Sequence, residues 1–555
     1  MMQVKLAWSA FKNMARRAAD DPLWAIVALI FLPFHAWKPF LMGLVVLLAV
    51  LLVVVFGGRT ILEVIGLGPD SLLYRLVDPL AWCVAVVLAF RLLTNPLIIH
   101  FGDMDGATHG TARFATNKEI APLARPSAGL LIGREKSGKL LRYDGPAHLL
   151  TMAPTRTGKG VGTIIPNLLT ADRSVICIDP KGENARITGR ARQKFGPVHI
   201  LDPFGVTGQT SAAFNPLDAL DPDGLDVAED ASTLADALVH DEPGQAGDAH
   251  WNEEGKALIA GVILHIVAHE PRDRRTLSTL RECLTLAPEA FTALLKTMQA
   301  ATAAGGLIAR AANRHLGKSD REAAGVLSAA QRHTHFLDSP RMSAVLARSD
   351  FRFGDLKART ATVFLVLPPD RLATYSRWLR LLVTQSLTDM ARTPAKPPAP
   401  VLYLLDEFAA LGHLAPVERA MGLMAGYGVQ LWPILQDVHQ LRATYGQRAG
   451  TFLSNAGVLL IFGVTDHDSA RLVSDLLGQE TVVFQTMGRA LDSEQSGISL
   501  GEQHTGRPLL TPDEVRNIPG HVELLFLAGQ RPIVASKLAY YADAEFRGLF
   551  DEEDR

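Results

Sequence analysis

A glycine-rich segment of the sequence has the residue types of a loop that binds phosphate. The apolar stretch 148–153 runs into PTRTGKGVG at 154–162, and the apolar stretch TIIPNLL follows. Between a strand and a helix, such a loop turns backbone N–H groups and the helix N-terminus toward phosphate oxygens, and Lys159 adds a positive charge. The candidate nucleotide-binding residues are Thr155, Arg156, Thr157, Gly158, Lys159, Gly160 and Val161.

This loop departs from the generic pattern at two positions. Ala153 stands where the first glycine belongs, and Gly160 replaces the hydroxyl residue that ligates Mg²⁺. Either Thr163 or a water held by a carboxylate then has to complete the metal shell. On the pattern alone, a solvated glycine turn is the alternative interpretation.

Polar side chains follow two further apolar stretches at the point where each ends. Asp406 and Glu407 come after VLYLL at 401–405, and Gln436 ends the next stretch, 431–436. At the carboxyl edge of a sheet, the first acid can hold Mg²⁺ through water and the second can polarise the attacking water. Gln436 can sense the γ-phosphate or that water. The alternatives are charges at a helix N-terminus for the two acids and a polar cap for Gln436.

Eight short apolar stretches predict the strands that position these residues. Continuous Val-, Ile- and Leu-rich strands separated by helices indicate a parallel sheet that is buried on both faces. The predicted strands are 148–153, 174–179, 198–202, 362–367, 401–406, 431–436, 458–462 and 523–527. The expected fold class is therefore α/β, with the architecture of a nucleotide-binding domain.

The strand pattern is interrupted once, between about residues 225 and 345. This stretch is rich in Ala and Leu at helical spacing, as in ALIAGVILHIVAHE. It predicts an all-α domain, 225–345, inserted into a nucleotide-binding domain that is formed by 105–224 and 346–555.

Composition excludes several classes of protein. With 555 residues, 48 % hydrophobic and 20 % charged, the chain has room for two to four folded domains. Its net charge of −2 excludes a histone-like coat of positive charge, so nucleic acid would have to bind at a local patch or pore. The 3 cysteines lie far apart in the sequence, which argues against a disulfide scaffold and a thiolate zinc site.

Apolar runs in residues 1–104 predict a membrane anchor. The stretches 40–58 and 79–99 are close to the length of a helix that crosses a bilayer. Basic residues before the first run favour a cytoplasmic N-terminus, and an even number of spans then places the large body in the cytoplasm as well. We expect 23–37 to lie at the membrane interface; a hairpin of 23–37 with 40–58 is the competing assignment.

Several motifs, in order and spacing, resemble those of type IV secretion coupling proteins, the TraG/TraD-like ATPases of bacterial conjugation. The likeness covers roughly residues 105–540, and the two-span anchor agrees with that family. The matching segments are HGTARFAT at 109–116, APTRTGKGVG at 153–162, IPNLL at 165–169, DPKGEN at 179–184, ILDPF at 200–204, FNPLD at 214–218, LLDEF at 404–408, Gln436, and GRPLLTPDEV at 506–515.

The resemblance implies a hexameric ATPase in the bacterial inner membrane, with a RecA-like motor domain and an inserted all-α domain. Its cofactors would be ATP and Mg²⁺. Its partners would be single-stranded DNA with its relaxase, or effector proteins, and the components of a type IV secretion channel. Such an enzyme hands these substrates to the channel during conjugative transfer.

The resemblance also implies a role for each site residue. Lys159 would hold the β- and γ-phosphates, Asp406 would organise Mg²⁺, and Glu407 would activate water. Gln436 would relay the state of the nucleotide. Arg507 is the candidate for an arginine that acts on the neighbouring subunit; a structural role beside the helix that begins near Thr511 is its alternative.

Two other functions compete with a coupling ATPase. A DNA translocase of the FtsK/HerA kind would usually carry a long linker and a C-terminal winged-helix domain, and we recognise neither in the sequence. A nonenzymatic, nucleotide-binding membrane receptor would have no need of Glu407. Substrate recognition is expected in the helical insert, where Arg272, Arg274, Arg275 and Arg281 form either a basic patch or a solvated helix face.

Overall fold

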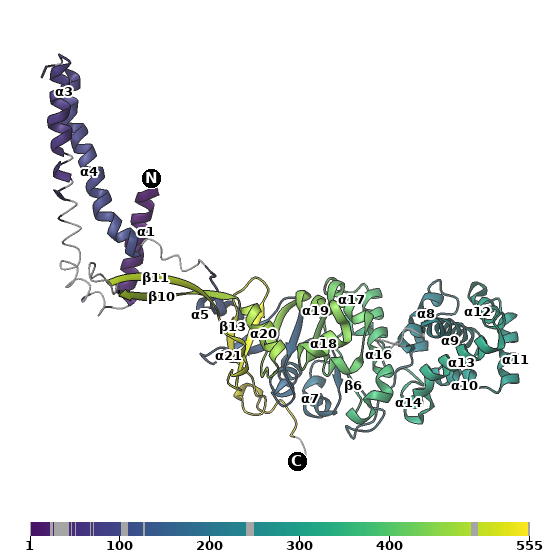
Figure 1. The fold of residues 1–555 in the computed structure, drawn as a ribbon. Coiled ribbons are helices and arrows are strands. Elements are labelled where there is room, and N and C mark those ends of the chain that lie inside the picture. Colours follow the sequence, from purple (N-terminus) through teal and green to yellow (C-terminus); the bar gives the residue numbers. More distant parts are fainter. Residues whose placement is uncertain are drawn as a thin grey trace. The chain divides into compact units, whose positions relative to one another are not determined.

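The chain forms two compact units in a computed structural model (Figure 1). One unit comprises residues 1–111 and 479–507, and the other comprises 112–478 and 508–555. The residues described are 2–20, 22, 26, 41, 44–45, 47–49, 51–66, 68–69, 71–101, 109–125, 128–239, 249–489 and 498–552.

Within the described residues, the second unit is built on an 11-stranded sheet in the order β2-β1-β13-β12-β9-β3-β8-β7-β4-β6-β5. The strands are β1 (Leu130–Arg134), β2 (Leu140–Tyr143), β3 (His148–Met152), β4 (Val175–Asp179), β5 (Val198–Leu201), β6 (Thr362–Val366), β7 (Val401–Leu405), β8 (Val429–Leu435), β9 (Ala456–Ile461), β12 (Val522–Leu527) and β13 (Ile533–Ser536). All eight predicted strands are present, and their ends differ from the predicted ones by at most two residues.

The sheet is parallel from β9 to β5 and antiparallel at its other side. Strands β9, β3, β8, β7, β4, β6 and β5 pair in parallel. The prediction of a purely parallel sheet is wrong for the stretch 523–527, because β12 pairs antiparallel with β9 and with β13. Strands β1, β2 and β13 were not predicted. They are only four or five residues long, and β2 and β13 are partly exposed, so their apolar pattern is short or interrupted.

Both faces of the parallel region are buried, as continuous apolar strands require. Along β3, the neighbouring side chains Leu149 and Leu150 belong to different hydrophobic clusters, and both are 0 % exposed. The same alternation separates Leu404 from Leu405 on β7. Each strand therefore contributes to two cores, one on each side of the sheet.

Helices follow the strands and cover the two faces of the sheet (Figure 1). They are α5 (Asn117–Ile120), α6 (Ile165–Thr170), α7 (Glu183–Gln193), α16 (Pro369–Arg392), α17 (Ala415–Leu423), α18 (Val438–Tyr445), α19 (Ala449–Asn455), α20 (His467–Leu477) and α21 (Pro512–Arg516). Shorter turns of helix are η2 (Ala121–Ala124), η3 (Gly160–Ile164), η4 (Pro216–Ala219), η9 (Phe408–Leu411), η10 (Met424–Tyr427), η11 (Gly446–Arg448) and η12 (Ala544–Phe546).

Between β5 and β6 the described residues form helices joined by turns and loops, with no strand among them. The helices are α8 (Val227–Leu238), α9 (Ala249–His269), η6 (Arg272–Arg274), α10 (Leu277–Leu284), α11 (Pro288–Gln299), η7 (Ala304–Gly306), α12 (Leu307–Leu316), α13 (Asp320–Thr334), η8 (His335–Asp338), α14 (Pro340–Val345) and α15 (Asp355–Ala358). Helix α9 is central, with α8, α12 and α13 packed around it. Gly261 permits the close approach of α12, because a Cβ there would lie 2.4 Å from the Cβ of Ala311.

Two of the four arginines predicted for a basic patch in the helical insert, Arg274 and Arg281, form ion pairs. Arg281 donates to both carboxylate oxygens of Asp338 at 2.7 Å, and Arg274 donates to Glu282 at 2.8 Å. Arg275 donates to the carbonyl of Glu270 at 3.0 Å. These contacts argue against a basic patch. A solvated face describes Arg272 and Arg274, which are exposed, whereas the side chain of Arg281 is 12 % exposed and helps to hold the helices together.

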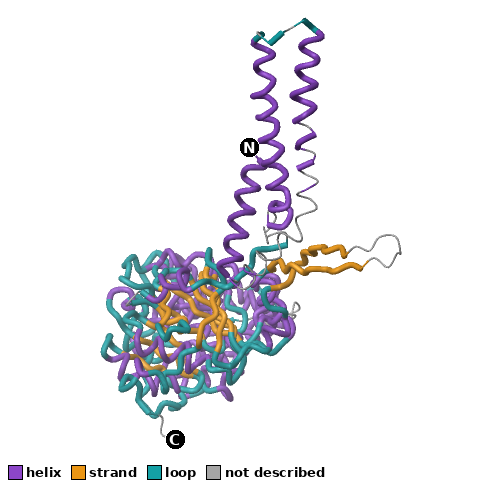
Figure 2. The backbone as a smooth tube through the Cα atoms, turned by 90° about the vertical axis from the view of Figure 1, so that its left-hand side faces the viewer, coloured by secondary structure: helices purple, strands orange, loops and turns teal. Residues whose placement is uncertain are grey.

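The first unit contains apolar helices and a two-stranded ribbon. Its elements are α1 (Met2–Asp20), η1 (Val53–Gly57), α3 (Gly58–Val64), α4 (Leu72–Phe101), β10 (Gln479–Arg489) and β11 (Ile498–Pro508); Figure 2 shows the two strands side by side. Among the described residues, two helical stretches are long and apolar enough to cross a membrane. They are Leu47–Val64, with 18 residues and a mean hydropathy of 2.2, and Leu72–Arg91, with 20 residues and a mean hydropathy of 1.8.

The two helical stretches overlap the predicted spans 40–58 and 79–99 but are shifted along the chain. In the second one, Leu80 and Trp82 are more than half exposed, which suits contact with lipid. Apart from Ile26, the stretch 23–37 lies outside the described residues. The ribbon of β10 and β11, which our boundaries placed in the nucleotide-binding domain, groups with these apolar helices.

One buried arginine joins three elements of the nucleotide-binding unit. Arg192 on α7 is 0 % exposed. Its guanidinium donates to the carbonyls of Ala171 and Arg173, both at 2.6 Å, and to the hydroxyl of Thr362 at 2.8 Å. It thereby ties the turn before β4 to the start of β6.

We predict that Arg192→Met lowers the free energy of unfolding by about 3 kcal/mol, because two buried carbonyls lose a charged donor. Urea unfolding of the full chain in detergent, followed by near-UV circular dichroism, measures the effect. Lys194→Met, at the exposed end of the same helix, should change the free energy by less than about 0.5 kcal/mol. Equal urea midpoints for Arg192→Met and Lys194→Met would contradict the proposed stabilising role of Arg192.

Candidate active site

The topology brings the predicted site residues to one edge of the sheet. Strand β3 lies between β9 and β8, and β8 lies between β3 and β7. In the parallel register, Met152 pairs with Leu435 and Leu405 pairs with Pro433. The three strands therefore end together, and the segments that follow them meet above that edge.

The phosphate loop has a turned backbone that needs its glycine. Gly158 has a φ of 93°, a conformation that residues with a Cβ rarely adopt, and Arg156 also has a positive φ, of 64°. The hydroxyl of Thr157 donates to the carbonyl of Pro154 at 2.6 Å and closes the turn. After Lys159, η3 and α6 continue as one helical stretch, so the loop ends at a helix N-terminus as predicted.

Lys159 lies between the two acids that follow β7. Its ammonium is 2.5 Å from Glu407 Oε1 and 3.2 Å from Asp406 Oδ1. Burial acts to lower the pKa of Lys159, but the carboxylates of Asp406 and Glu407 outweigh it and raise the pKa. Lys159 is therefore cationic, and it neutralises part of the charge of the two acids.

Asp406 and Glu407 differ in their surroundings. Asp406 has a side chain that is 15 % exposed, and burial raises its pKa although Lys159 acts in the opposite direction. Glu407 is 32 % exposed and has a φ of 51°. This left-handed turn directs Glu407 away from the strand, and its own N–H donates to Asp406 Oδ1 at 3.0 Å.

Gln436 contacts the more exposed of the two acids. Its Nε2 donates to Glu407 Oε2 at 3.2 Å, while its backbone N–H donates to the side chain of Gln440 at 3.0 Å. The structure thus brings together four predicted residues from three strands: Lys159, Asp406, Glu407 and Gln436. Gln440 was not among the predicted residues. It lies one helical turn after Gln436, and its side-chain oxygen accepts the hydrogen bond from the backbone N–H of Gln436.

The residues at this edge fit a magnesium ion bound mainly through water and phosphate. Mg²⁺ typically takes one or two carboxylates and completes its shell with water and phosphate oxygens. Asp406 and Glu407 supply such oxygens, and in the part of the chain that is described there is no cluster of three or more acidic, His or Cys ligands. Thr163 is a poor candidate ligand because it is 2 % exposed.

A third carboxylate lies close to the site but serves the fold. Asp179 ends β4, the neighbour of β7, and accepts a hydrogen bond from the N–H of Ala185 at 2.8 Å. Burial raises its pKa to about 6, and repulsion from Asp406 adds to the effect. In the DPKGEN motif, Asp179 thus caps the following helix, α7.

The structure places the other predicted site residues in two different units. Thr155, Arg156, Thr157, Gly158, Gly160 and Val161 form the loop and the first turn of η3 around Lys159. Arg507 is exposed and lies in β11, in the unit that contains the apolar helices. Thr511 caps α21 through reciprocal hydrogen bonds with Glu514.

Comparison with known proteins agrees with the geometry. Residues 112–553 match the family described as "Type IV secretory system Conjugative DNA transfer". A conjugal transfer protein TraG from Escherichia coli is 30 % identical over 494 residues, which cover 79 % of this chain and 77 % of that protein. Protein VirD4 from Rhizobium rhizogenes is 28 % identical over 519 residues, covering 85 % and 72 %.

A solved structure has the same fold. The plasmid coupling protein TrwB, in complex with ADP and Mg²⁺, superposes with a TM-score of 0.60 and 18 % identity. The match covers 80 % of this chain and 100 % of that one. The fold class, an α/β domain of the RecA-like P-loop type, is therefore confirmed.

We predict that Lys159→Ala and Glu407→Gln both abolish ATP turnover by different routes. Loss of Lys159 removes a charge that binds phosphate, so nucleotide affinity should fall at least about tenfold. Loss of the Glu407 carboxylate should leave affinity within about threefold, because a group that activates water acts mainly in the transition state. Binding of ADP by calorimetry and release of phosphate from ATP measure the two effects separately.

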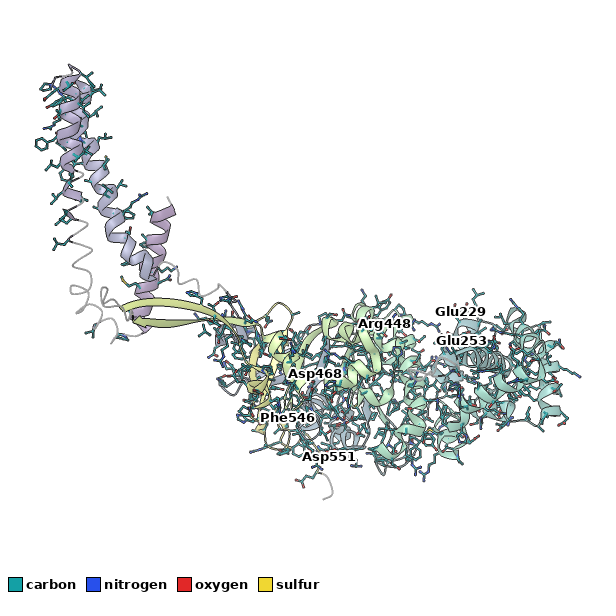
Figure 3. All side chains as sticks on the ribbon, in the orientation of Figure 1. Glu229, Glu253, Arg448, Asp468, Phe546 and Asp551 are labelled. Atoms are coloured by element: carbon teal, nitrogen blue, oxygen red, sulfur yellow. The ribbon has the colours of Figure 1, made fainter. Side chains whose placement is uncertain are left out.

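A matched control for Glu407→Gln is Glu229→Gln, on the exposed surface of α8 (Figure 3). It makes the same chemical change outside the site and should leave turnover unchanged. Normal turnover in Glu407→Gln would exclude the role assigned to this residue.

Proposed function

The chain belongs to the type IV secretory system conjugative DNA transfer family, and from this membership we propose how it works as a coupling ATPase of type IV secretion. In our proposal, the protein hydrolyses ATP with Mg²⁺ and uses the energy to pass DNA with its relaxase, or effector proteins, to a secretion channel. The observation that carries the proposal is the contact of Lys159 with Asp406 and Glu407 at the end of three parallel strands.

In this mechanism, the nucleotide replaces the acids as the partner of Lys159. Phosphate oxygens attract the Lys159 ammonium and the N–H groups of the loop, and Asp406 and Glu407 are released from their ion pairs. Mg²⁺, held by Asp406 through water, would balance the charge of the phosphates. TrwB with ADP and Mg²⁺ supports the same ligands for this chain.

Glu407 and Gln436 are proposed to act on the attacking water. Once Lys159 turns to phosphate, the freed carboxylate of Glu407 can orient a water and accept its proton. Gln436 touches the same carboxylate, so it can move with Glu407 when the γ-phosphate is lost. A change in nucleotide is thereby passed to α18, which begins directly after Gln436 and Asp437.

The apolar helices of the first unit support an inner-membrane location. Two helices long enough to span, with an even number of crossings, would leave both ends of the chain in the cytoplasm. We further propose that the protein is a homohexamer in which Arg507 reaches the γ-phosphate bound by a neighbouring subunit. A guanidinium supplied in this way is worth about 10³–10⁵ in rate in related phosphoryl transfers.

The proposed function predicts that Glu407→Gln abolishes conjugative transfer without removing the protein from the membrane. Donor cells carrying the variant in place of the wild type should transfer DNA at least about 100-fold less often, because the motor cannot turn over. Donors carrying Glu229→Gln provide the matched comparison, with membrane fractions blotted for both proteins. Undiminished transfer by Glu407→Gln donors would contradict a motor role.

A second prediction tests whether Arg507 acts across a subunit boundary. Arg507→Ala alone and Lys159→Ala alone should both be inactive. In mixed rings, some sites combine an intact phosphate loop with an intact arginine, so ATP turnover should partly return. If mixed rings form and no mixing ratio restores turnover, Arg507 acts within its own subunit or only structurally.

A further inference from the structure

A second lysine, Lys537, contacts the backbone of the phosphate loop. Lys537 is half-buried, and its Nζ donates to the carbonyl of Thr157 at 2.7 Å. The same ammonium lies 4.7 Å from the ring centroid of Phe462, close enough for a cation–π contact. Phe462 directly follows β9, the strand beside β3.

The antiparallel side of the sheet delivers Lys537 to this position. Lys537 comes one residue after β13, and its N–H donates to the carbonyl of His521 at 2.9 Å, which prolongs the pairing with β12. The chain then follows the loop, where the N–H of Tyr540 donates to the carbonyl of Val161 at 3.4 Å.

Gly162 permits this close approach. A Cβ at Gly162 would lie 2.8 Å from the carbonyl oxygen of Leu538. Residues 537–540 therefore pack along the phosphate loop from Thr157 to Gly162, and this packing depends on strands that are remote in sequence from the loop.

The contact with Thr157 fixes the direction of the next amide. In a trans peptide unit the C=O and the N–H point to opposite sides. When Lys537 holds the carbonyl of Thr157, the N–H of Gly158 is turned away from Lys537. A cation on the carbonyl also polarises the peptide unit, which makes that N–H a stronger donor to an anion.

We propose that Lys537 is a positioning residue for nucleotide binding, which aims the Gly158 N–H at the phosphates by holding the Thr157 carbonyl. This inference rests on the proposed ATPase function and adds a residue to it. Lys537 acts through the loop, and Lys159 supplies the direct contact.

Another role for Lys537 would be to favour the charged form of Glu523, a buried residue of β12, since burial raises the pKa of Glu523 and the charge of Lys537 acts to lower it. The two roles differ in their consequences. If Lys537 serves only Glu523, then Glu523→Gln and Lys537→Met should have similar effects on nucleotide affinity. If Lys537 aims the loop, Glu523→Gln should leave that affinity within about twofold of the wild type.

The test is binding of MgADP to the full chain in detergent, by calorimetry. Lys537→Met should raise the Kd about tenfold, because a charge-assisted hydrogen bond that shapes the loop is lost. Lys537→Arg, which keeps a charged donor, should stay within about threefold. Lys136→Met, in the exposed turn after β1, is the matched control and should not change the Kd.

Steady-state kinetics separates positioning from a loss of folded protein. Positioning predicts that Lys537→Met raises KM for ATP about tenfold and changes kcat less than about twofold. A lower kcat at unchanged KM, or a Kd equal to that of the wild type, overturns the inference. If the Met variant does not fold, Lys537→Gln and Lys537→Arg are compared by the same criteria. Failure of the wild type to bind nucleotide would overturn the proposed function itself. If the wild type binds MgADP and Lys537→Met binds it with the same Kd, this inference alone is overturned.

Discussion

The position of Lys159 between two carboxylates is the interaction on which the active edge of the sheet depends. Asp406 is largely buried, which disfavours its charge, and Glu407 adds a second negative charge beside it. Without a nearby cation, these two acids would repel each other at the end of a buried strand. Lys159 supplies the cation, and because it belongs to the phosphate loop, the proposed binding of phosphate there would compete with this arrangement.

The proposed exchange of partners would need a loop that is held firmly on its other side. Lys159 could then turn from the acids to phosphates while the backbone that carries it stays in place. The contacts of Lys537 with Thr157 and of residues 538–540 with the start of η3 provide such a support. These contacts come from residues that follow β13, in the antiparallel part of the sheet. The mixed topology of the sheet therefore contributes to holding the phosphate loop.

The sequence predicted the parts of the site that follow parallel strands and missed those that do not. Asp406, Glu407 and Gln436 could be assigned because the carboxyl ends of adjacent parallel strands meet at one edge. The direction of β12, the existence of β13 and the contact of Lys537 depend on pairing between segments far apart in the chain, for which an apolar pattern gives no signal. Residue type alone likewise did not reveal that Arg274, Arg275 and Arg281 of the insert are hydrogen-bonded, since their partners come from other helices or from a carbonyl.

Packing behind the acids explains how a change at Glu407 can extend beyond the site. Phe408, the next residue, is fully buried and stacks on Tyr445 at a centroid distance of 5.7 Å with an interplanar angle of 6°. Tyr445 is the last residue of α18, the helix that begins just after Gln436. Glu407 is thus joined to α18 at both ends of the helix, by a hydrogen bond through Gln436 and by an aromatic pair through Phe408. A stacked pair of this kind adds about 0.5–1.5 kcal/mol beyond burial, which would favour a movement of α18 together with Glu407 in the proposed change of partner by Lys159.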